Sequence, residues 1–239
     1  APFDNVNVRK ALNLSLDRNV ITDKVLGQGQ TPTYVFTPTY IEEGQLIQQP
    51  AYSKEPMAQR NEEAIKLLEE AGYSKANPLK FSILYNTNEN HKKVAIAAAS
   101  MWKANTKGLI DVKLENQEWK TYIDSRRAGR YDAARAGWNA DYNQATTFGN
   151  YFLSNSSNNT AKYANPEYDK AIAESYVATD AEGRAKAYAK AEEILAKDFG
   201  IVPIFNYVNP RLVKPYVKGY SGKDPQDHIY LRNLYIIKH

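Results

Sequence analysis

The chain has 239 residues, enough to bury a hydrophobic core of its own. It carries 31 Lys and Arg against 27 Asp and Glu, a formal net charge of +4, and the slight basic excess is spread out instead of forming the block that nucleic-acid binders show. The absence of cysteine excludes thiolate nucleophiles, thiolate zinc sites and iron–sulfur clusters, and the three histidines lie far apart in sequence. We therefore expect no metal, no cofactor and no nucleic-acid partner.

Hydropathy argues against a membrane span. No apolar run approaches the roughly 18 residues that cross a bilayer, and the mean hydropathy is -0.62. The sequence opens with Ala-Pro-Phe-Asp, without an initiator Met or an apolar signal stretch, so we expect a portion of a longer, processed polypeptide. Tyrosine is frequent, at 18 residues against 7 Phe, and a ring with a polar tip suits half-wet surfaces such as ligand clefts.

The first part of the chain is predicted to be helical, then irregular, then helical again. Apolar positions recur every four residues across 7–26, with Asp17 placed to cap the second of two helices and Gly27 to end it. Four prolines between 31 and 56 exclude a long helix and predict an extended, ordered loop. An amphipathic helix is expected over 61–72.

A strand, a helix and a second strand are predicted next. Residues 79–85 and 110–116 alternate apolar and polar side chains, which is typical of half-buried strands. An Ala-rich helix from about 91 to 104 separates them and can serve as the crossover between neighbouring strands.

The rest of the chain is predicted to continue this alternation. We expect a helix over 120–127, a strand across 131–137, a polar loop through 154–159, helices over 166–178 and 181–197, and a strand over 199–204. Beyond residue 207, Pro and Gly punctuate a segment that closes on an apolar strand at 234–237. Interleaved helices and strands indicate an α/β fold. We expect one lobe at 1–207 and a C-terminal segment at 208–239 that packs outside this lobe.

The densest group of chemically useful residues lies between 131 and 143. In a strand, Arg135 and Gly137 would share a face, Trp138 would point the other way, and Asp141 would follow the strand end. A guanidinium and a carboxylate separated by about six extended residues, up to roughly 20 Å, can hold the two ends of a zwitterion such as a short peptide. The same residues also fit an Arg–Asp pair at a strand end with Trp as core filler.

Other patterns support alternative functions less well. Glu115 and Glu118 could act as the acid and nucleophile of a carbohydrate-active enzyme, but nothing in the sequence shows an apolar pocket that would raise one pKa, and such a carboxylate commonly caps the next helix. The Tyr-rich loop at 31–56 could serve a surface adhesin. Gly27-Gln28-Gly29 follows a helix, so a phosphate-binding loop is not supported. His91 fits either a solvent-facing turn or a cationic ligand contact.

Several longer stretches together resemble one family. They are 114–121 (LENQEWKT), 134–143 (ARAGWNADYN), 156–161 (SSNNTA), 201–203, 207–215 and 233–239 (NLYIIKH). On these stretches the chain resembles the oligopeptide-binding subunits of bacterial ABC peptide importers, the dipeptide, oligopeptide and nickel solute-binding family. The resemblance covers essentially the whole chain, although binders of this family are considerably longer.

The resemblance implies a periplasmic-binding-protein-like α/β lobe, a mixed sheet flanked by helices, with 208–239 returning to the other lobe. It implies a monomeric, non-catalytic receptor in the periplasm of a Gram-negative bacterium that captures peptides of about two to six residues and delivers them to a membrane ABC permease. A specialised ligand, either a cell-wall peptide or haem, stays open because the other lobe would build part of the side-chain pockets.

The resemblance also assigns site residues position by position. Asp141 matches the aspartate that pairs with the peptide's N-terminal ammonium, and the main chain of Gly137, Trp138 and Asn139 matches the segment that binds the ligand as an added strand. The basic positions that would meet the C-terminal carboxylate are Arg135, Arg126 and His91. The positions that would line side-chain pockets are Trp119, Trp138, Asn86, Asn158, Thr160 and Tyr207. The chain departs from the family pattern with Asn139 in place of a cysteine and with a longer turn at 105–110.

Overall fold

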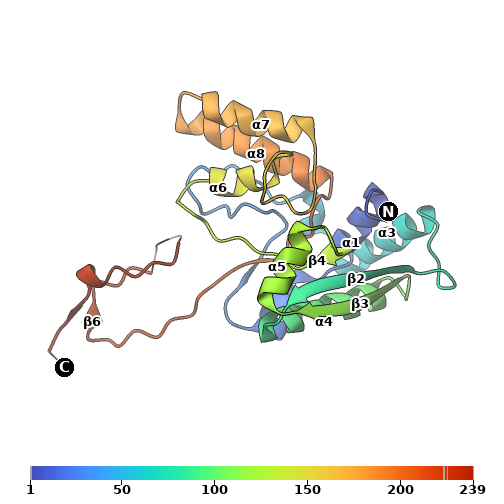
Figure 1. Ribbon diagram of the computed structural model, residues 1–239, viewed down its shortest axis with the longest axis horizontal. Coiled ribbons are helices and arrows are strands. Elements are labelled where there is room, and N and C mark those ends of the chain that lie inside the picture. Colours follow the sequence, from blue (N-terminus) through green and yellow to red (C-terminus); the bar gives the residue numbers. More distant parts are fainter. Residues whose placement is uncertain (1, 223, 225, 239) are drawn as a thin grey trace.

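The computed structural model describes residues 2–222, 224 and 226–238. Its buried apolar side chains form two clusters, one around a three-stranded sheet and one around a pair of long helices, and the C-terminal segment extends away from both (Figure 1). Within these residues no helix is long and apolar enough to cross a membrane.

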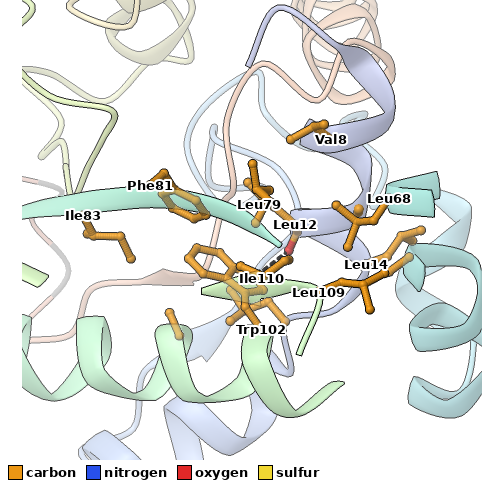
Figure 2. Packing of buried hydrophobic residues seen from close by; sticks show 14 of the residues in the cluster. Val8, Leu12, Leu14, Leu68, Leu79, Phe81, Ile83, Trp102, Leu109 and Ile110 are labelled. Carbon is orange, nitrogen blue, oxygen red and sulfur yellow. Dashed lines mark hydrogen bonds between the residues drawn. The ribbon is translucent and has the colours of Figure 1, made fainter. Parts of the chain in front are cut away.

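The first cluster packs helices on the sheet. Its elements are α1 (Val6–Leu14), α3 (Met57–Glu70), β2 (Leu79–Asn86), α4 (Glu89–Asn105) and β3 (Ile110–Gln117). Figure 2 shows Trp102 of α4 facing Phe81 and Leu12, and its Nε1 donates a hydrogen bond of 2.9 Å to the Leu12 carbonyl. Because large apolar side chains such as Leu79 and Ile110 are at most 1% exposed, each contributes about 1.5–3 kcal/mol to folding.

The sheet has the strand order β3-β2-β4, and its strands are parallel. Leu79 pairs with Ile110 in β3, and Ile83 pairs with Ala133 in β4 (Ala133–Ala134). The predicted strand, helix and strand unit is therefore confirmed, with α4 as the crossover. Antiparallel pairing occurs in two separate ribbons, one between β1 (Thr31–Pro32) and β5 (Phe205–Asn206) and one in the C-terminal segment.

The predicted helix boundaries near the start of the chain are confirmed. α2 (Arg18–Val20) continues into a π-helical turn, η1 (Ile21–Leu26). The Asp17 side chain accepts a hydrogen bond from the Val20 main chain, and Gly27 ends the turn with φ of +63°, a conformation that glycine adopts without strain. The following loop contains only β1 and the short 3-10 turn η2 (Ala51–Lys54), as the prolines predict.

The second cluster is helical. It contains α6 (Thr146–Gly149), η3 (Asn150–Phe152), α7 (Pro166–Val177) and α8 (Ala181–Lys197). Asn165 and Asp180 cap α7 and α8 with their side chains. A methyl group on Gly149 would lie 2.7 Å from Ile172 Cδ1, so α6 and α7 approach each other closely because this residue has no side chain. The helix predictions for this region, and for α5 (Trp119–Arg127), are confirmed.

Two strand predictions need correction. The strand expected over 131–137 is limited to β4, because only Ala133 and Ala134 pair with β2. The last strand, expected within 198–207 and over 199–204, is shorter and displaced: Phe199 has φ of +47° and Pro203 has no N–H to donate, so the strand in this range is β5 alone.

The C-terminal segment from residue 208 onward is largely exposed. It contains β6 (Val217–Lys218), η4 (Leu231–Asn233) and β7 (Tyr235–Ile236), with β6 and β7 antiparallel. The strand expected at 234–237 therefore exists in shorter form. Leu212 and Leu231 are 104% and 76% exposed, and Figure 1 shows the segment extending to one side of the two clusters.

Candidate functional site

A cavity of about 1050 Å³ opens where the two clusters meet the start of the C-terminal segment. One wall is the chain that runs from β4 to α6, residues 133–140, which Figure 1 shows crossing between the two groups of elements. The sequence-predicted site residues that line the cavity are Arg126, Arg135, Gly137, Trp138, Asn139, Thr160 and Tyr207. Sites for small ligands are typically concave and of this size.

Residues 136–140 offer unpaired main-chain groups to the cavity. Arg135 still donates its main-chain N–H to the Leu84 carbonyl of β2, at 2.8 Å. From Ala136 to Ala140, no main-chain N–H or carbonyl has a hydrogen-bond partner within the part of the chain that the structure describes. Because unpaired backbone groups in a strand-like segment are a template for another chain, this wall can accept an added strand.

Arg135 and Gly137 share one face of this wall, as the alternation predicts. The Arg135 guanidinium hydrogen-bonds to the Tyr207 hydroxyl and lies 5.6 Å from the Tyr207 ring centre. A methyl group on Gly137 would lie 2.6 Å from Tyr207 Cζ, so this ring fits only against a glycine. Trp138 points the other way and packs edge-to-face on Tyr151 with ring centres 5.0 Å apart.

Arg126 supplies a second cation at the cavity wall. One of its terminal nitrogens donates to the Tyr151 hydroxyl at 2.9 Å and to Thr160 Oγ1 at 3.0 Å. Its Nε is buried and has no partner among the described residues. An arginine that is held by neutral hydroxyl groups, and that forms no ion pair among the described residues, is suited to bind a carboxylate.

Asp141 stands beyond the free main-chain segment and is exposed. Its carboxylate accepts a hydrogen bond of 3.2 Å from the Thr147 hydroxyl, and Gln226 donates to its main-chain carbonyl. It is not among the cavity-lining residues, and no ion pair among the described residues involves it. Its negative charge is therefore free to pair with a ligand cation at this end of the wall.

The structure does not place His91, Asn86, Trp119 or Asn158 on the cavity wall. His91 Nδ1 lies 2.8 Å from Asn86 Oδ1, and burial, reinforced by the positive charge of Arg135, lowers the pKa of His91 to about 4. The imidazole is therefore neutral at pH 7, and a positive charge at the site comes from the arginines.

The other two residues lie at the surface. Trp119 is 56% exposed and stacks on Tyr122 with ring centres 5.8 Å apart. Asn158 is exposed, whereas its neighbour Asn159 is buried and donates to the Tyr163 carbonyl at 2.7 Å. Asn159 thus organises the loop that presents Thr160.

The paired glutamates lack the geometry of a glycosidase site. Glu118 caps α5 by accepting the Lys120 main-chain N–H at 2.9 Å, and Glu115 lies 3.4 Å from Lys113 Nζ at the surface. Neither lines the cavity. Across the described ranges there is also no group of three or more acidic and histidine side chains that could hold a metal ion.

Sequence reasoning identified Tyr207 but missed two other tyrosines of the site. Tyr131 and Tyr151 line the cavity, and Tyr131 donates its hydroxyl to the Thr160 carbonyl. Asp132 also lies on the wall and accepts hydrogen bonds from the Ser82 main chain at 2.8 Å and from its hydroxyl at 3.0 Å. The abundance of tyrosine was the only sequence signal for these cavity-lining rings, but composition does not show which tyrosines come together at the cavity.

The family of the chain follows from comparison with known proteins. Residues 1–160 match the profile of the bacterial extracellular solute-binding proteins, family 5, middle region. The chain belongs to this family. The family and the periplasmic-binding-protein-like fold predicted from the sequence are thereby confirmed.

Relatives of this solute-binding family match the whole chain. It is 97% identical over 239 residues to the periplasmic oligopeptide-binding protein OppA of Haemophilus influenzae and 44% identical over 238 residues to the periplasmic murein peptide-binding protein MppA of Escherichia coli. In each case the whole chain is covered, but only 44% of the relative. The chain therefore spans less than half the length of the curated relatives it matches.

Solved structures of family members agree with the fold. A crystal structure of Haemophilus influenzae OppA in complex with the peptide RPPGFSPFR matches with a TM-score of 0.92 at 97% identity, and covers 100% of this chain and 46% of that one. The unliganded open form of MppA matches with a TM-score of 0.88 at 43% identity, with the same coverage.

Proposed function

We propose that this solute-binding chain is part of a receptor that captures short peptides and delivers them to a membrane ABC permease. The observation that carries the proposal is the run of unpaired main-chain groups at 136–140 on a cavity wall. An extended peptide can pair with this run as an added strand, which gives affinity without reading the peptide's sequence.

The charges at the two ends of the run fit the two ends of a peptide. Arg126 and Arg135 lie on the cavity wall, and Asp141 follows the run. A carboxylate bound by the arginines and an ammonium bound by Asp141 would fix the direction of the peptide. His91, being neutral, would contribute a hydrogen bond instead of a charge. The rings of Trp119, Trp138 and Tyr207, the amides of Asn86 and Asn158, and the Thr160 hydroxyl would then border the side chains of the ligand.

The relatives support a peptide as ligand class. One relative is named for oligopeptides, another for murein peptides, and the solved complex contains a nine-residue peptide. We propose peptides of about two to six residues as the usual ligands. We also propose a periplasmic, monomeric and non-catalytic protein, since the relatives are named as periplasmic binding proteins.

The domain division stays a proposal as well. We assign 1–207 to the peptide-binding lobe and 208–239 to a segment that belongs to the other lobe. The contrast between two packed clusters and the exposed apolar side chains after residue 208 supports this division.

The test is Asp141→Asn in the full-length protein, measured by isothermal titration calorimetry with trialanine. Truncating one partner of a desolvated charge pair costs about 2–5 kcal/mol, so affinity should fall at least about thirtyfold. N-acetylated trialanine, which lacks the ammonium, should bind the wild type and the variant equally weakly. The matched control is Asp124→Asn, the same change at an exposed aspartate of α5. Unchanged affinity of Asp141→Asn for trialanine would refute the assignment of this end of the site.

A further inference from the structure

One buried side chain connects the two arginines of the cavity wall. Tyr122 lies in α5, is 1% exposed, and is not itself a lining residue. Its ring is 5.5 Å from the Arg126 guanidinium carbon, and its hydroxyl donates a hydrogen bond to the Arg135 main-chain carbonyl.

The helix geometry explains the arrangement at Arg126. Residues three and four apart share a helix face, so Trp119, Tyr122 and Arg126 form one row on α5. The Trp119 and Tyr122 rings are stacked at an interplanar angle of 30°. The Arg126 guanidinium is thus held by the negative face of an aromatic ring together with the Tyr151 and Thr160 hydroxyl groups.

The hydroxyl of the same residue acts on the free main-chain segment. It donates to the carbonyl of Arg135, the residue directly before the unpaired run at 136–140. Burial raises the pKa of the Tyr122 phenol, so the group stays protonated and remains a donor at neutral pH. The ring and the hydroxyl therefore restrain two different parts of the wall.

We propose that Tyr122 is a positioning residue for the ligand, whose ring holds Arg126 where it meets the peptide carboxylate and whose hydroxyl fixes the main chain that precedes the added strand. This inference rests on the proposed peptide-binding function and assigns it a residue that does not touch the ligand.

The experiment separates the two roles in the full-length protein. Affinities for trialanine and for its C-terminal amide are measured by calorimetry, and their ratio reports recognition of the carboxylate. Tyr122→Phe removes the hydroxyl alone, so both peptides should weaken by a similar factor and the ratio should stay within about twofold. Replacement of Tyr122 by pentafluorophenylalanine keeps the shape but reverses the ring's charge distribution, so the ratio should fall by about fivefold relative to Tyr122→Phe.

Tyr168→Phe is the matched control. Tyr168 is 2% exposed and donates its hydroxyl to the Gly149 carbonyl at 2.7 Å, so the same group is lost from a buried tyrosine that does not line the cavity. Its affinity for both peptides should equal that of the wild type. All variants are checked for folding by circular dichroism, and thermal unfolding of the fluorinated variant measures the strain of its larger ring.

Two results would overturn the positioning role. Equal ratios for Tyr122→Phe and the fluorinated variant would show that the ring does not hold Arg126 for the carboxylate. A loss of the ratio in Tyr122→Phe itself would show that the hydroxyl, and not the ring, controls carboxylate recognition. Failure of the wild-type protein to bind trialanine would instead refute the proposed function, and this inference would fall with it.

Discussion

At the scale of the residue, the absence of a side chain at position 137 decides the shape of the cavity wall. A methyl group there would lie 2.6 Å from Cζ and 2.9 Å from Cε2 of Tyr207, distances that real Cβ atoms do not show. The ring is held at this position by its hydrogen bond to Arg135. Gly137 therefore controls where the Arg135 guanidinium points, although it contributes no functional group.

Gly137→Ala should consequently weaken binding of trialanine by about tenfold or more, because Tyr207 must move and release Arg135. Since Gly137 is exposed and outside any helix or strand, the free energy of unfolding should change by less than about 0.5 kcal/mol. Calorimetry with the full-length protein and urea unfolding measure the two quantities. Wild-type affinity in this variant would show that the Arg135–Tyr207 contact does not matter for the ligand.

At the scale of the element, a buried carboxylate on α8 anchors the loop that forms another part of the cavity wall. Glu192 is 6% exposed and accepts hydrogen bonds from the main chain of Phe36 at 3.1 Å and of Thr37 at 2.7 Å, and from the Thr37 hydroxyl at 2.5 Å. Burial raises the pKa of this carboxyl while these donors oppose the shift. The loop has almost no regular structure of its own, so its position depends on such contacts.

Glu192→Gln should therefore destabilise the protein. One amide nitrogen would replace an accepting oxygen and face N–H donors that it cannot satisfy, which costs about 1–3 kcal/mol. Urea unfolding gives the change in free energy. The control is Glu193→Gln, whose carboxylate makes an exposed pair with Lys197 at 2.6 Å and should matter by at most about 1 kcal/mol. Equal effects of the two substitutions would contradict the anchoring role.

The elements that the sequence predicts well are those that carry their own signals. β2 and β3 show period-two alternation, and the caps at Asp17 and Gly27 mark helix ends. The extent of β4 could not be predicted, because alternation does not reveal whether a neighbouring strand is present to pair with. For the same reason, the strand expected over 199–204 is misplaced. The strand that forms in this region, β5, pairs with β1, which lies far away in sequence.

The site residues also fall into two groups, those that the sequence identifies and those that only the folded structure reveals. Family resemblance led to Arg126, Arg135 and the Gly137 region, which do line the cavity. It gave no indication that His91 is neutral, because the lowered pKa depends on burial and on the proximity of Arg135 in the folded chain. It also missed Tyr122, since a contact with two arginines is visible only once α5 is placed against β4.

At the scale of the whole molecule, the exposed apolar side chains of the C-terminal segment are expected to be buried against another protein surface. Leu231, Tyr235 and Ile236 are each at least 60% exposed and lie close together in sequence, and Leu212, earlier in the segment, is 104% exposed. Soluble proteins rarely leave contiguous apolar patches open to water. The relatives that match the chain are more than twice as long, so their additional length offers a surface that could bury this segment within one polypeptide.

Leu231→Glu in the full-length protein tests whether the apolar side chains of the C-terminal segment are buried. If the side chain is buried there against another lobe, introducing a carboxylate without a partner should lower the free energy of unfolding by about 2–4 kcal/mol, measured with urea. Lys218→Glu makes a comparable acidic change at an exposed polar position of β6 and should cost at most about 1 kcal/mol. If Leu231→Glu costs no more than Lys218→Glu, the segment is not packed through its apolar side chains, and the division of the chain after residue 207 loses its physical basis.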